Sequence, residues 1–156
     1  KIDKLTNAIK IKYLDILNNA VITISEKDDF ELSCHYGIEN FYQNGALIIS
    51  KINRQYCKKL IAMLPNQTHP QHRHLQKEEC FELLYGDCTL TLNGRAIQLK
   101  LGYPILINRK VNHSFKTLKG CVIEEISTTH IIGDSIYEDP VISKLPLSDR
   151  KIKIIL

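Results

Sequence analysis

The chain has 156 residues, of which 44% are hydrophobic and 24% are charged, values typical of one globular domain with a sizeable core. Its formal net charge is +4, and no block of five or six like charges occurs, so we expect no nucleic-acid partner. No apolar run is long enough to span a bilayer, so we expect no membrane partner either.

The five cysteines, at positions 34, 57, 80, 88 and 121, include no Cys-x-x-Cys pair. An odd number cannot all pair within one chain, so we expect reduced thiols that pack as small apolar residues. Reduced thiols are typical of a cytoplasmic protein. The chain begins with Lys1 rather than Met, which suggests either a truncated chain or a domain of a longer protein.

The first 45 residues are expected to form an N-terminal helix and an extension. Ile2, Leu5, Ile9 and Ile16 are spaced for one face of a helix, which predicts a helix over residues 2–19. Residues 25–44 are of mixed character and are expected to form short strands and loops. Residues 46–156 are then the barrel of what is a single domain overall.

From residue 46 onward, short β-branched and apolar segments alternate with turn residues. Asn93-Gly94, between two such segments, strongly indicates a hairpin, and Lys151–Leu156 is expected to be a last strand. Many short strands and little helix predict an all-β sandwich or barrel. The predicted strands are Ala46–Ile52, Lys58–Leu64, Cys80–Tyr85, Thr89–Leu92, Ala96–Leu99, Ile105–Ile107 and Val122–Ile126.

Four side chains have the composition of a metal site. His72 and His74 are separated by one residue and therefore point to the same side of a strand. Glu79 can return from the next strand, and His113 can complete the site from another. Three imidazoles and one carboxylate suit a divalent Mn, Zn, Fe or Ni ion with open positions. The alternative is a set of polar strand residues that are hydrogen-bonded inside a barrel.

The order and spacing of these residues resemble the two cupin motifs. The first motif is His-x-His, four residues, Glu, six residues, Gly, and is matched by His72, His74, Glu79 and Gly86. In the second motif Gly102 and His113 match, while Asn108, Lys110 and Thr117 replace Pro, Gly and Asn. The resemblance implies a cupin double-stranded β-helix, or jelly roll, in which the ligands are kept and the turn chemistry is changed.

A wider resemblance covers the D-lyxose ketol-isomerase family of cupins. It is carried by Tyr56–Lys59, Leu64–Thr68, His72–His74, Glu78–Phe81, Glu125–His130 and Asp134–Pro140. Two segments, His35–Glu39 and Ile52–Leu60, resemble more closely the cupin domain that follows the synthase domain of long sialic acid (N-acetylneuraminate) synthase-like proteins. The resemblance implies a metal-bearing jelly roll of aldose–ketose isomerase ancestry, with a fused synthase domain as one possible partner.

Lys59 and Glu125 are the catalytic candidates. Alternation allows only one of Lys58 and Lys59, and one of Glu124 and Glu125, to face the barrel interior. The resemblance selects Lys59, which adds positive charge, and Glu125, which moves a proton between sugar carbons. The alternatives are a surface lysine and a buried carboxylate that is paired for structure with Lys59 or Arg73.

The polar segment after residue 128 folds over the mouth of the barrel, according to the same resemblance. It supplies Asp134 and Tyr137 as candidate substrate-binding residues, with a solvated loop as the alternative. Sheet edges and an apolar outer face further predict a homodimer.

The predicted site is compatible with three functions. In the first, a sugar isomerase, the metal holds O1 and O2 of an open-chain sugar and stabilises an enediolate. The second is a non-catalytic sugar-sensing or assembly domain of a sialic acid synthase-like protein. The third is an oxygen-dependent dioxygenase, which uses the same four ligands. Fold alone does not decide among them.

Overall fold

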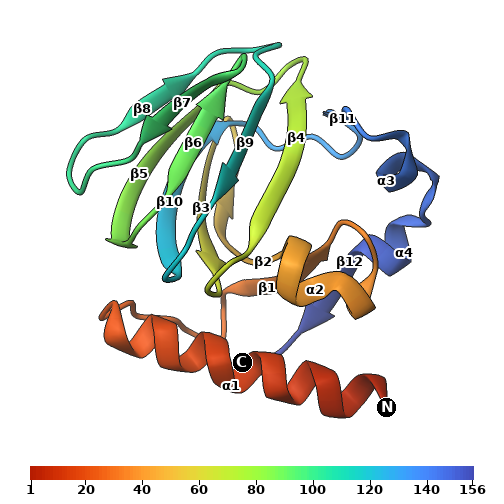
Figure 1. The fold of residues 1–156 in the computed structure, drawn as a ribbon. Coiled ribbons are helices and arrows are strands. Elements are labelled where there is room, and N and C mark those ends of the chain that lie inside the picture. Colours follow the sequence, from red (N-terminus) through yellow and green to blue (C-terminus); the bar gives the residue numbers. More distant parts are fainter.

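The computed structural model describes all residues from 1 to 156, and its centre is a pair of facing antiparallel sheets (Figure 1). The strands are β1 (Asp29–Cys34), β2 (Gly45–Asn53), β3 (Tyr56–Met63), β4 (Thr68–His74), β5 (Glu79–Gly86), β6 (Thr89–Leu92), β7 (Arg95–Gln98), β8 (Ile105–Ile107), β9 (His113–Lys116), β10 (Cys121–Thr128), β11 (Ser135–Tyr137) and β12 (Lys151–Ile154). One sheet has the order β12-β1-β2-β3-β10-β5-β8, and the other has the order β11-β4-β9-β6-β7. This all-β architecture agrees with the prediction from the sequence.

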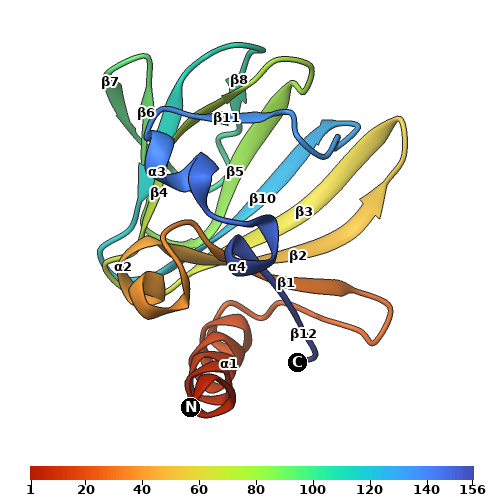
Figure 2. The same ribbon diagram turned by 90° about the vertical axis from the view of Figure 1, so that its right-hand side faces the viewer.

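Helices lie outside the sheets. They are α1 (Ile2–Asn19), the 3₁₀ helix η1 (Ile38–Asn40), α2 (Phe41–Asn44), α3 (Pro140–Lys144) and α4 (Leu147–Arg150). The predicted opening helix is therefore confirmed, whereas the segment 25–44 contains two helical turns in addition to β1. Helix α1 runs below β1 and β12, so the two ends of the chain lie on the same side of the molecule (Figure 2). No helix is both long and apolar enough to cross a membrane.

The large sheet is buried on both faces where α1 covers it, because the side chains of its strands alternate. Leu60 on β3 packs toward α1 and Tyr13, whereas Ile61, the next residue, packs into the space between the sheets. On β10, Ile123 stands opposite Ile61 and also faces the interior. The same alternation continues along β3 and β10. Every second side chain therefore faces the interior, also where these strands reach the mouth of the barrel.

The predicted N-terminal extension and the barrel share one sheet. Strand β1 pairs with β2 from Asp29↔Ser50 to Cys34↔Gly45, and on its other side it pairs with β12. The extension and the barrel are thus parts of one hydrogen-bonded sheet.

Two turns show why the motif positions hold their backbone shape. Gly86 has φ +79°, and a Cβ added there would lie 1.9 Å from the Gly120 carbonyl oxygen, so only glycine fits. Lys110 stands where the second motif has glycine, yet its φ is also positive, at 67°. Its N–H donates to the His74 carbonyl at 2.7 Å, which ties this turn to β4. The turn is retained although its sequence has changed.

The residue that ends α1 allows a first prediction. Val21 has φ 56°, a conformation that is unfavourable for a β-branched residue, and it is 87% exposed. The Val21 and Ile22 N–H groups donate to the Asn18 and Leu17 carbonyls, which is the Schellman pattern that favours glycine. Val21→Gly is expected to raise the free energy of unfolding by about 0.5–1 kcal/mol. The backbone strain that it relieves in the folded state is larger than the entropy by which glycine stabilises the unfolded chain. Urea titration measures this difference, and Val21→Ala, which keeps the strained φ, should show no such gain.

Candidate functional site

The mouth between the two sheets forms a small polar cavity. Its walls come from both sheets, namely β1, β2, β3, β5, β10 and β12 of the large one and β4, β9 and β11 of the small one, together with the turn between β4 and β5. Buried ionisable side chains are concentrated here, although the rest of the barrel interior is apolar. The site residues that line it are Lys59, His72, His74, Lys77, Glu79, Glu125 and Tyr137.

Three of the four predicted metal ligands converge from two neighbouring strands. His72 and His74 share one face of β4, and His113 on β9 stands directly opposite His72. One ligand atom from each of these three histidines lies within 4.8 Å of the other two. Glu79, the first residue of β5, brings its carboxylate to within 3.3 Å of the His74 Nε2 and 3.1 Å of the His113 Nε2. All four side chains are buried.

The hydrogen bonds around these ligands show whether they fit a cation. The Nδ1 atoms of His72 and His113 lie 3.0 and 2.9 Å from the backbone carbonyls of Pro70 and Val111, so Nδ1 carries the proton. The Nε2 of His113 is then a bare acceptor, and it faces another acceptor, a Glu79 oxygen, with no donor at either atom. Two buried acceptors at this distance repel each other unless a positive charge lies between them. The residues therefore fit a divalent cation.

The charge state of the histidines agrees with this assignment. Burial, together with the proximity of His113 and His74, lowers the pKa of His72 well below its usual range. His72 is thus neutral at physiological pH, and neutral imidazole is the form that binds a metal.

Lys77 was not among the residues predicted from the sequence, yet it connects the two carboxylates of the cavity. Its ammonium lies 2.9 Å from a Glu79 oxygen and 3.2 Å from a Glu125 oxygen, and only 4% of its side chain is exposed. Burial alone acts to lower the pKa of Lys77, but the charges of Glu125 and Glu79 outweigh it and raise that pKa. Lys77 lies in the turn between β4 and β5, where no strand alternation could show which way its side chain points.

Asp134 holds this turn rather than lining the cavity. Its carboxylate accepts hydrogen bonds from the backbone N–H groups of Leu75, Gln76 and Lys77, at 3.1, 2.9 and 3.0 Å. Its oxygens are therefore already engaged, although the sequence predicted them to bind substrate. Tyr137, the other predicted substrate-binding residue, stands opposite His72 on β11 and does line the cavity.

Lys59 and Glu125 both face the interior, which is the orientation expected from the sequence. They stand opposite each other on β3 and β10, on the same faces as Ile61 and Ile123. Their neighbours Lys58 and Glu124 point outward and pair with each other at 3.3 Å. Burial and the nearby charge of Glu79 raise the pKa of Glu125, opposed by Lys77 and Lys59. The partner of Glu125 is Lys77, not Lys59 or Arg73 as the structural alternative proposed.

Comparison with known proteins finds similarity to sugar isomerases. No model of a known protein family matches the chain. The chain is 28% identical to the D-lyxose ketol-isomerase of Thermofilum sp. (strain ex4484_79), over 92% of this chain and 96% of the relative. It is 26% identical to the D-lyxose/D-mannose isomerase of Thermosediminibacter oceani, over 82% of this chain and 86% of that relative.

The solved structures agree on the fold. The crystal structure of Acinetobacter sp. DL28 L-ribose isomerase in complex with L-ribose superposes with a TM-score of 0.75, covering 90% of this chain and 94% of that one at 13% identity. The chain is similar to cupin-like sugar isomerases. The predicted cupin jelly roll is therefore confirmed.

Removal of the Lys77 charge is expected to be strongly destabilising. Lys77→Met leaves two buried carboxylates without their shared partner, and removing one side of a buried ion pair typically costs about 3–5 kcal/mol. Urea titration of the metal-free protein measures the loss. Lys58→Met removes a lysine from the exposed pair with Glu124 and should cost less than about 1 kcal/mol. Equal losses in the two variants would contradict the bridging role of Lys77.

Proposed function

We propose that this protein is a metal-dependent sugar isomerase that interconverts an aldose and a ketose through an enediolate. One observation carries the proposal: Lys77 bridges the Glu125 carboxylate to Glu79, whose own oxygens face the histidine triad. A carboxylate beside a site for a divalent ion is the arrangement that proton transfer between adjacent sugar carbons requires. The similarity to sugar ketol-isomerases supports the same reaction.

In this mechanism His72, His74, Glu79 and His113 hold the ion. When bound, a divalent ion supplies Lewis acidity, which makes the hydrogen on the carbon next to the sugar carbonyl more acidic. Glu125 takes the proton from C2 of the aldose and returns it to C1, while the hydroxyl proton on O2 is transferred to O1. Its raised pKa suits this role, because a base that also returns the proton works best when its pKa is close to the working pH.

The remaining residues position the catalytic carboxylate and the sugar, and they stabilise the charge that develops on the substrate. Lys77 fixes the Glu125 carboxylate and adds positive charge where negative charge develops on the substrate oxygens. Asp134 acts through Lys77, since it holds the backbone of the turn that carries this lysine. Lys59 and Tyr137, on opposite walls of the cavity, contact the part of the sugar beyond the reacting carbons.

Proton exchange in heavy water tests this proposal. The metal-loaded protein is incubated with a panel of aldoses, and NMR follows deuterium at C2 of the aldose and C1 of the ketose. An isomerase incorporates deuterium and forms ketose. Binding without exchange would instead indicate the non-catalytic sugar-sensing or assembly domain of a sialic acid synthase-like protein, and oxygen uptake by the Fe(II)-loaded protein would indicate a dioxygenase.

We further propose a cytoplasmic homodimer with one divalent ion per chain. The apolar side chains exposed on the outer face of the large sheet, such as Leu106 on β8 and Ile126 on β10, support a covered surface there. Light scattering at micromolar concentration checks the dimer. A monomer would favour a domain that is covered by a fused synthase domain.

A further inference from the structure

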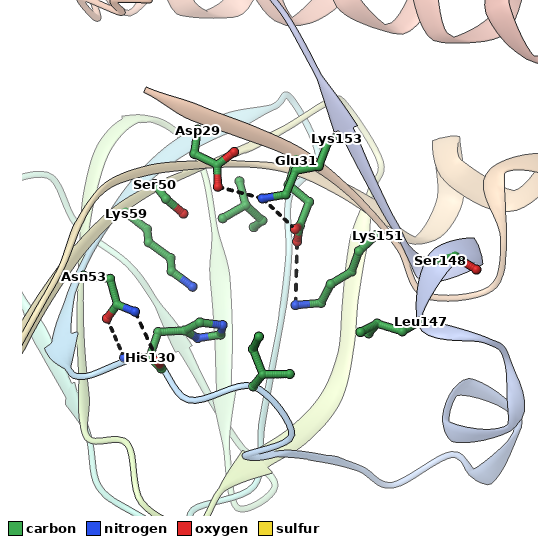
Figure 3. A pocket seen from close by; sticks show the side chains of 12 residues that line it. Asp29, Glu31, Ser50, Asn53, Lys59, His130, Leu147, Ser148, Lys151 and Lys153 are labelled. Atoms are coloured by element: carbon green, nitrogen blue, oxygen red, sulfur yellow. Dashed lines mark hydrogen bonds and ion pairs between the residues drawn. The ribbon is translucent and has the colours of Figure 1, made fainter. Parts of the chain in front are cut away.

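A second and larger chamber adjoins the metal-side cavity. It has a volume of about 540 Å³ and lies between β1, β2, β12, α4 and the segment at residues 130–132 (Figure 3). Glu31, Ile48, Lys59 and Lys151 line both spaces, so the two are direct neighbours. A volume of this size is in the range that holds a whole small-molecule ligand. The chamber can therefore take a substituent of the sugar that extends away from the reacting carbons.

Lys59 is the feature of this chamber that needs an explanation. Its side chain is only 8% exposed, and its ammonium forms no hydrogen bond and no ion pair within the chain. Glu125, which stands opposite, is already engaged by Lys77. Buried charged groups are normally paired, since removal from water disfavours the charged form. Burial accordingly lowers the pKa of Lys59.

The carboxylates of the chamber pair with other lysines and not with Lys59. Lys153 lies 2.6 Å from Asp29 and 3.4 Å from Glu31, and Lys151 lies 3.6 Å from Glu31. The two carboxylates of the chamber are therefore held by Lys151 and Lys153. Lys59 forms no ion pair with them, and Glu125, whose charge acts to raise the pKa of Lys59, is itself paired with Lys77.

The polar nitrogens of the chamber come from three separate elements. Lys59 on β3, Lys151 on β12 and the ring of His130 point into the same space (Figure 3). The backbone of His130 is fixed by Asn53, which accepts from its N–H at 2.8 Å and donates to its carbonyl at 3.2 Å. Burial, followed by the charges of Lys59, Lys77 and Lys151, lowers the pKa of His130 to about 3. His130 is thus a neutral hydrogen-bonding group in a positive environment.

We propose that this chamber binds an anionic group of the substrate, a phosphate ester or a carboxylate, at the end of the sugar away from the reacting carbonyl. Lys59 supplies the charge, and Lys151 and His130 supply further hydrogen bonds. This inference rests on the proposed function for the position of the reacting carbons. It makes the substrate an anionic sugar, whereas the relatives are named for neutral ones.

Calorimetric binding to the metal-free protein tests the chamber independently of catalysis. The probes are matched in configuration: D-mannose, D-mannose 6-phosphate and D-mannuronate, and then D-ribose with D-ribose 5-phosphate. In at least one set, we expect the anionic sugar to bind about ten- to a hundredfold more tightly than its neutral counterpart, the value of one charge-assisted hydrogen bond. Comparison of the phosphate ester with the carboxylate, D-mannose 6-phosphate with D-mannuronate, identifies which anion the chamber binds.

Two matched variants on β3 attribute the preference to Lys59. Lys59→Met should reduce the preference to within about twofold, whereas Lys58→Met, which changes an outward lysine, should leave it intact. Lys59→Met should not lower the Tm, because it removes an unpaired buried charge. A neutral sugar that binds as tightly as both anions, or a preference that survives Lys59→Met, would overturn the inference.

Failure of this inference and failure of the proposed isomerase are distinguishable. Deuterium exchange of neutral sugars without any preference for anionic ones keeps the isomerase and overturns the anionic chamber. A preference for anionic sugars that depends on Lys59, without exchange in the metal-loaded protein, keeps the chamber and overturns the isomerase.

Discussion

Glu125→Gln is expected to slow deuterium exchange at C2 by about a hundredfold or more, while the fold and the bound metal are retained. Glutamine has nearly the shape of glutamate but cannot accept the proton, and removal of a general base typically has an effect of this size. Lys77 keeps its contact with Glu79, so the turn that carries it stays in place. NMR exchange rates at saturating metal, with metal analysis of the same sample, measure the effect.

The same strand offers a control for this variant. Glu124→Gln changes the neighbouring carboxylate, which faces outward and pairs with Lys58, and should leave the exchange rate unaltered. An unchanged rate in Glu125→Gln would exclude the proton-transfer role. A large loss of stability would instead indicate that Glu125 serves mainly as the buried partner of Lys77.

The inward orientation of Lys59 and Glu125 was predictable in part, because strand alternation is a local property. Once Ile61 and Ile123 are recognised as interior residues, every second residue along β3 and β10 must face the same way. The sequence could not by itself decide which of two adjacent lysines or glutamates was inside, since both alternatives fit the same period. That choice came from the resemblance to D-lyxose ketol-isomerases, and the structure agrees with it.

Lys77 and Asp134 show where prediction from the sequence ends. Lys77 lies in a turn, which has no period, and the direction of its side chain depends on backbone hydrogen bonds that this turn donates to Asp134, 57 residues later. Asp134 was expected to bind substrate because it is polar and lies in the segment over the barrel mouth. A carboxylate that accepts three backbone hydrogen bonds serves the fold first, and nothing local in the sequence reveals those bonds.

The outer chamber depends on contacts that are still more distant. Glu31 on β1 meets Lys151 and Lys153 on β12 only because the first and last strands pair at the edge of the large sheet. The strand at the end of the chain was predicted, but its partner was not. A pocket formed by residues more than a hundred positions apart becomes visible only when the sheet order is known.

The double variant His72→Ala with His74→Ala is expected to abolish metal binding. The wild-type protein should carry close to one divalent ion per chain, measured by elemental analysis after dialysis. The variant loses both ligands that β4 supplies, and the remaining Glu79 and His113 are too few for a protein site that normally has three or four ligands. Retention of the ion at full occupancy would show that the site lies elsewhere.

Thermal denaturation separates loss of the metal from loss of the fold. A metal that binds only the folded state stabilises it by about 2.7 kcal/mol at a hundred times its Kd, so added metal should raise the Tm of the wild type. The variant should still unfold cooperatively, because the core between the sheets is apolar, but its Tm should not respond to metal. Glu78→Ala, beside the ligand Glu79 but paired with Arg109 at the surface, should keep both the ion and the response. If the double variant responds to metal as the wild type does, the facing acceptors of His113 and Glu79 need another explanation.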